Sequence, residues 1–270
     1  MDFVADIPPD MRSEILGKLR RVEETERVRV LFAIESGSRA WGFPSPDSDF
    51  DARFVYVRER DWYLSITPGR DVIELPIEGD LDINGWDVKK ALELLLKPNP
   101  VLLEWLSSPI RYLWDDGACE ALNSIAARTV FGPACLHHYL NLGEGLWNRH
   151  IAPNDRIKLK KYFYILRPAM ALRWIRTNPD VMPPMNFQQL MAGVDVPEAV
   201  EHAVLELLEA KQKTKELGLA ARVPVIDDFV TKEFGNAKTF EPVRIRNRPR
   251  LKAEADNLFR HFVNEKPISP

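Results

Sequence analysis

Two aspartates, Asp49 and Asp51, lie two positions apart at the start of a segment with the composition of a β-strand. Alternate residues of an extended chain share a face, so the two carboxylates are expected to point the same way. Carboxylates held that close repel each other, and a cation between them relieves the repulsion. Oxygen ligands of this kind suit Mg²⁺ or Mn²⁺, which also take oxygens from substrate phosphates.

A Gly-Ser turn, Gly37-Ser38, precedes this pair and follows the apolar segment Val28 to Ile34. A glycine removes the bulk of a side chain, and backbone N–H groups at such a turn can receive a phosphate. An Asp-x-Asp pair alone more often marks a solvated strand end. With the Gly-Ser turn ahead of it, the hypothesis of a metal-dependent nucleotide site becomes the better one.

A third acid is needed for this hypothesis, because two-metal phosphoryl chemistry commonly takes a carboxylate from a neighbouring strand. Asp82 is the preferred candidate, since it lies in a short predicted strand with the apolar Leu81 and Ile83 on the opposite face. Asp80 shares the face of Asp82 but lies nearer a turn, and Asp87 is expected to cap the helix that follows. The alternative for Asp82 is a strand-end residue bound to backbone.

A basic and aromatic segment, 158–168, is predicted to be helical. Lys160, Tyr164 and Arg167 fall at i, i+4 and i+7, on one stripe of a helix. Such a stripe could clamp a triphosphate and stack on a base across a cleft. The alternative, about equally favoured by spacing alone, is a solvated helix face.

Composition places the chain among ordinary globular proteins, with 270 residues, 45% hydrophobic residues and 29% charged residues. A net charge of −3 argues against a broad nucleic-acid-coating surface but allows a local basic channel. Cys119 and Cys135 form no C-x-x-C pair, and the acidic N-terminus lacks the layout of a signal peptide. No apolar run approaches membrane-spanning length, so a cytoplasmic location is expected. Neither a Walker motif nor G-x-S-x-G occurs.

The order of elements predicts an α+β protein, with a mixed β-sheet and flanking helices in 1–117 and helices throughout 118–270. Pro168 is expected to kink or break one helix, and Pro179 to Pro184 to form a linker. Strands are expected at 28–34, 49–57, 71–77, 80–84 and 111–114. Later helices are expected near 118–129, 134–150, 157–176, 197–217, 225–234 and 250–264.

The motifs together resemble the DNA polymerase β superfamily of nucleotidyltransferases. More closely, they resemble a bacterial branch that is tied to RNA-repair pathways and often called RlaP or YcgL-like. The resemblance covers roughly 30–175 and rests on Glu35 to Gly42, Ser45 to Phe54, Asn84 to Asp87 and Lys160 to Tyr164.

This resemblance implies a nucleotidyltransferase domain at 1–117 and a helical domain at 118–270. It implies that Gly37 and Ser38, with the adjacent Arg39, bind the triphosphate. Asp49 and Asp51 would hold the metals, Mg²⁺ or Mn²⁺, and Asp82 would complete the acid triad.

The expected reaction is transfer of a nucleoside monophosphate from an NTP to a hydroxyl group, with release of pyrophosphate. The acceptor could be an RNA end, a protein side chain, as in AMPylating-type enzymes, or a small molecule. A rival hypothesis is a non-catalytic nucleotide sensor or partner-binding module on the same fold. The sequence does not give the base preference, the acceptor or the oligomeric state, and no membrane partner is expected.

Overall fold

The structure is a computed structural model, which describes residues 6–67, 69–129, 131–213, 218–242 and 248–265. The chain divides into two compact units that are discontinuous in sequence. Within the described residues, one unit, here called the sheet unit, contains 6–37, 49–129 and 248–265. The other, the helical unit, contains 38–48 and 131–242. Each is described by itself below.

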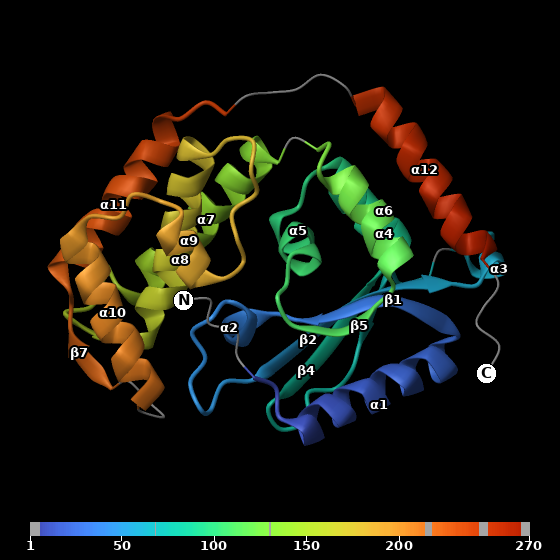
Figure 1. The fold of residues 1–270 in the computed structure, drawn as a ribbon, viewed down its shortest axis with the longest axis horizontal. Coiled ribbons are helices and arrows are strands. Elements are labelled where there is room, and N and C mark those ends of the chain that lie inside the picture. Colours follow the sequence, from blue (N-terminus) through green and yellow to red (C-terminus); the bar gives the residue numbers. More distant parts are fainter. Residues whose placement is uncertain (1–5, 68, 130, 214–217, 243–247, 266–270) are drawn as a thin grey trace. The chain divides into compact units, whose positions relative to one another are not determined.

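A five-stranded mixed sheet forms the centre of the sheet unit (Figure 1), as the α+β prediction required. The strand order is β3-β4-β2-β1-β5, with β2 and β4 parallel and the other neighbouring pairs antiparallel. In Figure 1, α1 (Pro9–Glu26) lies along one face of the sheet, and α4 (Val88–Leu96) and α6 (Asp116–Ala126) lie along the other. The strands are β1 (Val28–Glu35), β2 (Phe50–Arg58), β3 (Val72–Glu74), β4 (Leu81–Asp87) and β5 (Arg111–Trp114).

These strands form where β-branched and aromatic residues alternate or run together. Three of β1's central residues, Leu31, Phe32 and Ile34, are fully buried, which confirms a strand covered on both faces. Strand β4 continues to Asp87, beyond the predicted end at Asn84. The Asp87 side chain then caps α4 by accepting a hydrogen bond from the Lys89 N–H at 2.8 Å, as predicted.

The remaining helices of the sheet unit do not follow the predicted division at residue 117. Helix α6 packs on α4, α5 (Pro100–Leu106) and β1, and α12 (Arg248–Asn264) packs on α4 and α6. Apolar residues on these helices, including Leu122 and Phe262, are buried. The amphipathic faces of α6 and α12 are therefore covered within the sheet unit, whereas the sequence analysis assigned both helices to the helical half. A short helix, α3 (Arg60–Tyr63), follows β2.

The helical unit is built around α8 (Lys160–Thr177), which packs against α7 (Gly132–His150), α9 (Phe187–Ala192) and α11 (Pro224–Thr239). Helix α8 continues through Pro168, which lacks the N–H that would bond the carbonyl of Tyr164. The unit also contains α10 (Glu198–Lys213), and the predicted continuation of this helix over 214–217 lies outside the described residues. Helix α9 and the two-stranded pair β6 (Arg156–Lys158) and β7 (Leu219–Ala221) were not predicted.

Residues 38–48 carry part of the Gly-Ser motif and pack within the helical unit. The Phe43 ring stacks on Phe163 at 5.3 Å between centroids and meets the edge of Phe187 at 5.7 Å. The Trp41 carbonyl accepts a hydrogen bond from the Phe187 N–H at 2.8 Å. The chain thus leaves the sheet unit after Gly37 and returns to it at Asp49. In the part of the chain that the structure describes, no helix has both the length and the apolar character needed to cross a membrane.

Candidate active site

Strands β2 and β4 place two of the predicted acids side by side. The parallel register pairs Asp51 with Asp82, and Arg53 with Asn84 two positions further on. Alternation along β2 buries Ala52 and Phe54 on one face and leaves the Asp51 and Arg53 side chains partly exposed, at 28% and 14%. Pairing with a neighbouring parallel strand therefore brings Asp51, Arg53 and Asp82 onto one partly open face of the sheet.

The backbone of Asp51 is held on both sides by the end of β1. Its carbonyl accepts a hydrogen bond from the Ser36 N–H at 2.8 Å, and its N–H donates to Oε1 of Glu35 at 2.9 Å. Glu35 is fully buried, and its Oε2 accepts a hydrogen bond from the Tyr112 hydroxyl at 2.5 Å. A carboxyl group buried this deeply is tolerated because hydrogen bonds satisfy its oxygens. Glu35 therefore holds the backbone of Asp51 in place near the start of β2.

Gly37 lies against the carboxylate of Asp51. Its φ is +62°, in the left-handed region that favours glycine. A Cβ built on Gly37 would come within 2.0 Å of Oδ2 of Asp51, far inside any van der Waals contact. The glycine of the predicted phosphate turn and the second predicted acid are thus immediate neighbours, and only glycine fits there.

The guanidinium group of Arg53 bridges the two acids. Its Nη2 donates to Oδ1 of Asp51 at 3.0 Å and to Oδ2 of Asp82 at 2.7 Å. Its Nη1 donates to the carbonyls of Ala52 at 3.0 Å and of Asp82 at 2.9 Å. With the Asn84 amide oriented to satisfy its neighbours, the amide oxygen also accepts from Arg53, at 3.3 Å. The guanidinium fork is therefore filled by acceptors from two strands.

Burial raises the pKa of Asp51 above its usual range. The positive charge and hydrogen bond of Arg53 oppose this rise in the pKa, while the negative charges of Asp82 and Asp49 add to it. All three predicted acids therefore act on one electrostatic neighbourhood. Asp49 itself is exposed and immediately precedes β2.

The donor chemistry of this cluster suits a hard divalent cation, because it consists of short carboxylates beside a backbone turn. Among the described residues, however, no group of three or more His, Cys, Asp or Glu side chains is gathered as a metal site. Between Asp51 and Asp82 the structure places the Arg53 guanidinium, so positive charge already occupies that position. The residues fit Mg²⁺ or Mn²⁺ by chemistry, and the binding of either metal stays a prediction.

The other predicted nucleotide-binding residues belong to the helical unit. Ser38 is buried, and its carbonyl accepts a hydrogen bond from the Phe43 N–H at 3.1 Å. Arg39 donates from Nη2 to the carbonyl of Ser48 at 2.6 Å, which closes the loop between them. Their predicted contacts with a triphosphate are not tested by these interactions.

Lys160, Tyr164 and Arg167 lie on α8, as predicted, but at different depths. Lys160 and Tyr164 are half-buried, and the Tyr164 ring meets the edge of Trp41 at 5.9 Å between centroids. Arg167 is only 4% exposed; it donates to the carbonyl of Met185 and lies 4.7 Å from the centroid of the Trp41 ring. The Arg167 side chain is therefore enclosed by other residues of the helical unit. Its contact with a nucleotide stays a prediction.

Two residues of the cluster, Glu35 and Arg53, had no predicted role. Sequence signals for both exist: Glu35 is an acid at the end of a buried apolar strand, and Arg53 shares its strand face with Asp49 and Asp51. Several of their partners, such as Asp82 for Arg53 and Tyr112 for Glu35, lie on other strands, which the sequence pattern alone does not identify.

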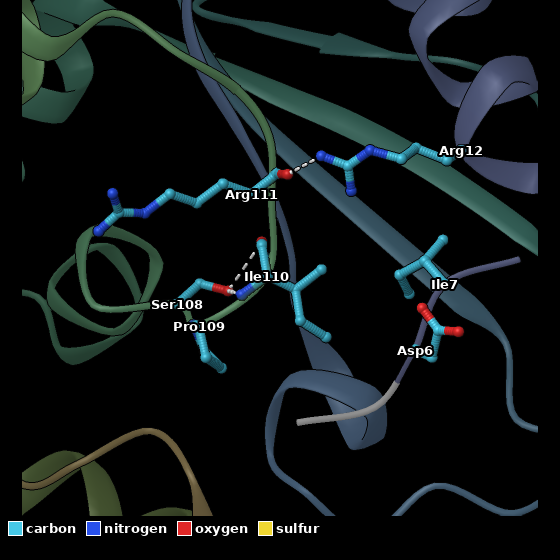
Figure 2. A pocket seen from close by; sticks show the side chains of 7 residues that line it. All are labelled: Asp6, Ile7, Arg12, Ser108, Pro109, Ile110 and Arg111. Carbon is cyan, nitrogen blue, oxygen red and sulfur yellow. Dashed lines mark hydrogen bonds between the residues drawn. The ribbon is translucent and has the colours of Figure 1, made fainter. Parts of the chain in front are cut away.

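A pocket in the sheet unit contains none of the predicted site residues in its lining. Figure 2 shows its lining: Arg12 points across it and donates to the backbone carbonyl of Arg111, and the Ser108 side chain turns toward Ile110. Asp6, Ile7 and Pro109 complete the lining. The two arginines and one acid give the pocket no clear ligand chemistry.

A family model and a curated relative both match most of the chain. Residues 11–261 match the model of RlaP, described as an RNA repair pathway DNA polymerase beta family. The uncharacterized protein YcgL of Bacillus subtilis (strain 168) is 42% identical over 223 residues, which cover 83% of this chain and 85% of that protein. A solved structure, a nucleotidyltransferase-like protein from Exiguobacterium sibiricum 255-15, is 11% identical with a TM-score of 0.31, over 94% of this chain and 91% of that chain.

Proposed function

This chain belongs to the RlaP family of the RNA repair pathway DNA polymerase beta group, and we propose that it is a metal-dependent nucleotidyltransferase. It transfers a nucleoside monophosphate from an NTP to a hydroxyl group and releases pyrophosphate. One observation carries the proposal. The parallel register of β2 and β4 sets Asp51 beside Asp82, with the Gly37 backbone directly against the Asp51 carboxylate.

In the proposed reaction, the acceptor hydroxyl oxygen forms a bond to the α-phosphorus of the NTP. The bond from that phosphorus to the pyrophosphate oxygen breaks, and the hydroxyl gives up its proton. Asp49, Asp51 and Asp82 would hold Mg²⁺ or Mn²⁺, which when bound neutralises phosphate charge and lowers the pKa of the attacking hydroxyl.

The protein's own part in this reaction is positioning and charge. Glu35 and Ser36 fix the backbone of Asp51, so its carboxylate has a defined direction. Gly37 is half-buried and has no side chain, so its backbone could receive a phosphate beside the Asp51 carboxylate. Asp82, on β4, is the candidate to accept the proton of the hydroxyl. Its side chain is partly exposed, so an acceptor hydroxyl could reach it.

An RNA end is the acceptor that we propose. Arg156 and Lys158 share the exposed face of β6, and the half-buried Lys160 and Lys161 follow at the start of α8. Within the described residues, none of these four cations forms an ion pair with a carboxylate, although the exposed Asp155 adjoins them in sequence. Arg156 donates to the carbonyl of Leu219, and Lys161 lies over the Tyr164 ring. Neither contact neutralises positive charge, and such charge favours a polyanionic substrate such as an RNA backbone. The family description, an RNA repair pathway, supports the same class.

The test is to incubate the protein with each α-labelled NTP, Mg²⁺ or Mn²⁺, and a pool of RNA ends and proteins. Pyrophosphate release is measured, and the label is located by gel. Asp49→Asn and Asp51→Asn are expected to lower turnover at least about 100-fold with folding retained, since each removes charge at the reacting phosphates. Asp80→Asn is the matched control: Asp80 is an exposed acid in the turn that precedes β4, and we expect near-normal turnover.

Three outcomes decide among the hypotheses. Label on RNA supports the proposal, and label on protein shows an AMPylating-type enzyme instead. Nucleotide binding without pyrophosphate release, across all acceptors, would identify a sensor. Full metal-dependent activity in Asp49→Asn and Asp51→Asn would overturn the assignment of the acids.

A further inference from the structure

The described acids that are expected to receive a metal are already bridged by a cation of the protein. Asp51 and Asp82 each give one carboxylate oxygen to Nη2 of Arg53, at 3.0 and 2.7 Å. We propose that Arg53 is a resident counter-cation of this site, which holds the two carboxylates ready for a divalent metal and competes with that metal for them. The inference rests on the proposed function, because it takes Asp51 and Asp82 as the metal-holding pair.

Each of the two carboxylates keeps one oxygen that Arg53 does not bind. Among the described residues, Oδ2 of Asp51 and Oδ1 of Asp82 accept no hydrogen bond, while Oδ1 of Asp51 and Oδ2 of Asp82 are bound by Arg53. Each acid is thus half-occupied. A divalent cation that uses the remaining oxygens meets the positive charge of Arg53 beside them, and this charge opposes its binding.

The Asp51 carboxylate and the Arg53 guanidinium differ in how freely each can move. The backbone of Asp51 is clamped by Glu35 and Ser36, and its carboxylate is packed against Gly37. Arg53, by contrast, reaches its partners through a long side chain with several rotatable bonds. The exposed fraction of that side chain is 14%. The Asp51 carboxylate is therefore the fixed part of the cluster, and the Arg53 guanidinium is the part that can yield to a metal.

The Arg53 bridge affects how the two carboxylates interact before a metal binds. Two carboxylates in adjacent register repel each other when no cation lies between them. Arg53 opposes that repulsion and bridges the pair through its two hydrogen bonds in the metal-free protein. Phosphate oxygens are good alternative acceptors for a guanidinium. The site is thereby kept in order without binding free metal tightly.

The experiment compares the wild type with Arg53→Gln, which removes the charge and keeps a polar side chain. Mn²⁺ binding is measured without nucleotide by electron paramagnetic resonance of the free ion, and thermal unfolding is recorded in chelator. Arg53→Gln is expected to bind Mn²⁺ about tenfold more tightly, since one nearby charge commonly changes an ionic equilibrium by a factor of ten or more. The metal-free variant should also unfold at a lower temperature.

Arg58→Gln is the matched control. Arg58 lies on the same strand, is similarly buried in its side chain (11%), and pairs with Glu26 at 3.1 Å instead of with the acids. It should lower the unfolding temperature and leave Mn²⁺ affinity unchanged. Unchanged or weaker Mn²⁺ binding in Arg53→Gln would overturn the role of Arg53 alone. Absence of Mn²⁺ binding in both wild type and Arg53→Gln would overturn this role and, separately from any turnover result, the metal part of the proposed function.

Discussion

The sheet unit and the helical unit each contain a triad of opposite charges, and the two triads are inverted in composition. In the sheet unit one base, Arg53, lies between two acids, Asp51 and Asp82. In the helical unit one acid, Glu233, lies between two bases, Arg173 and Arg176. Both are hydrogen-bonded ion clusters within one structural unit, so the comparison isolates what differs between them.

The first difference is saturation. Glu233 is fully buried, and each of its oxygens accepts from a different arginine: Oε1 from Arg173 at 2.8 Å and Oε2 from Arg176. The acids of the sheet unit are partly exposed, and each uses one oxygen only. An acid that is fully buried and binds an arginine through each oxygen is not accessible to a ligand. A half-occupied, open pair is accessible, which is why the sheet-unit triad is the candidate for chemistry and the helical-unit triad is structural.

The strongest way to break this comparison is to remove the buried acid. Glu233→Ala leaves two arginines facing each other beside α11, and loss of one partner from a buried ion pair costs about 3–5 kcal/mol. The free energy of unfolding, measured by urea denaturation, should fall by that amount. Glu201→Ala on the exposed side of α10 is the control and should stay within about 0.5 kcal/mol of wild type. An equally small effect for Glu233→Ala would show that its ion cluster is not structural.

The sequence predicted the elements of the two units better than the partners of their charged residues. Runs such as Val28 to Ile34 define strands by composition, and Asp87 was identified as a cap because its position before an apolar helix allows little else. Strand β4 was predicted to end at Asn84, whereas it continues through Gly85 to Asp87. A Cβ at Gly85 would lie 2.4 Å from the Phe54 ring, so the glycine makes room for an aromatic neighbour inside the sheet.

The candidate site was predictable only in part, because its geometry depends on register. The spacing of Asp49, Asp51 and Asp82 pointed to one face, but the bridge made by Arg53 requires β2 and β4 to be parallel neighbours in that register. On α8 the stripe pattern indicated a shared face and gave no depth. That helix is buried almost all round, which is typical of a core helix and explains why Arg167 is enclosed.

A smaller effect is expected from Gly37→Ala, which tests whether the open character of the sheet-unit triad depends on its turn. The left-handed backbone costs a non-glycine residue about 1–2 kcal/mol, and the new Cβ would also displace the Asp51 carboxylate. We expect a lower free energy of unfolding together with weaker Mn²⁺ binding. Gly79→Ala is a matched control, because Gly79 has φ +59° and open space where its Cβ would stand. Equal loss of stability without a change in Mn²⁺ binding in both variants would show that Gly37 does not support the acid.

The smallest effect concerns pH and sharpens the contrast in unmet negative charge. Burial raises the pKa of Asp51 above 3.8, with contributions from Asp82 and Asp49, even though Arg53 opposes the shift. The folded protein then binds this proton more tightly than the unfolded chain does. Protonation of Asp51 therefore contributes stability that is fully present below the unfolded pKa and is lost as pH rises through the folded pKa.

Asp51→Asn removes this titration, so it supplies the reference. The free energy of unfolding of the wild type minus that of Asp51→Asn, measured by urea denaturation in chelator at a series of pH values, should fall as pH rises from 3.8 through the raised pKa. Above that window the difference should be constant. A difference that rises with pH would mean that Arg53 outweighs burial and the neighbouring acids, and keeps Asp51 ionised as strongly as an ordinary surface ion pair. The sheet-unit triad would then be as satisfied electrostatically as its counterpart around Glu233, and the argument that it is held ready for a cation would lose its basis.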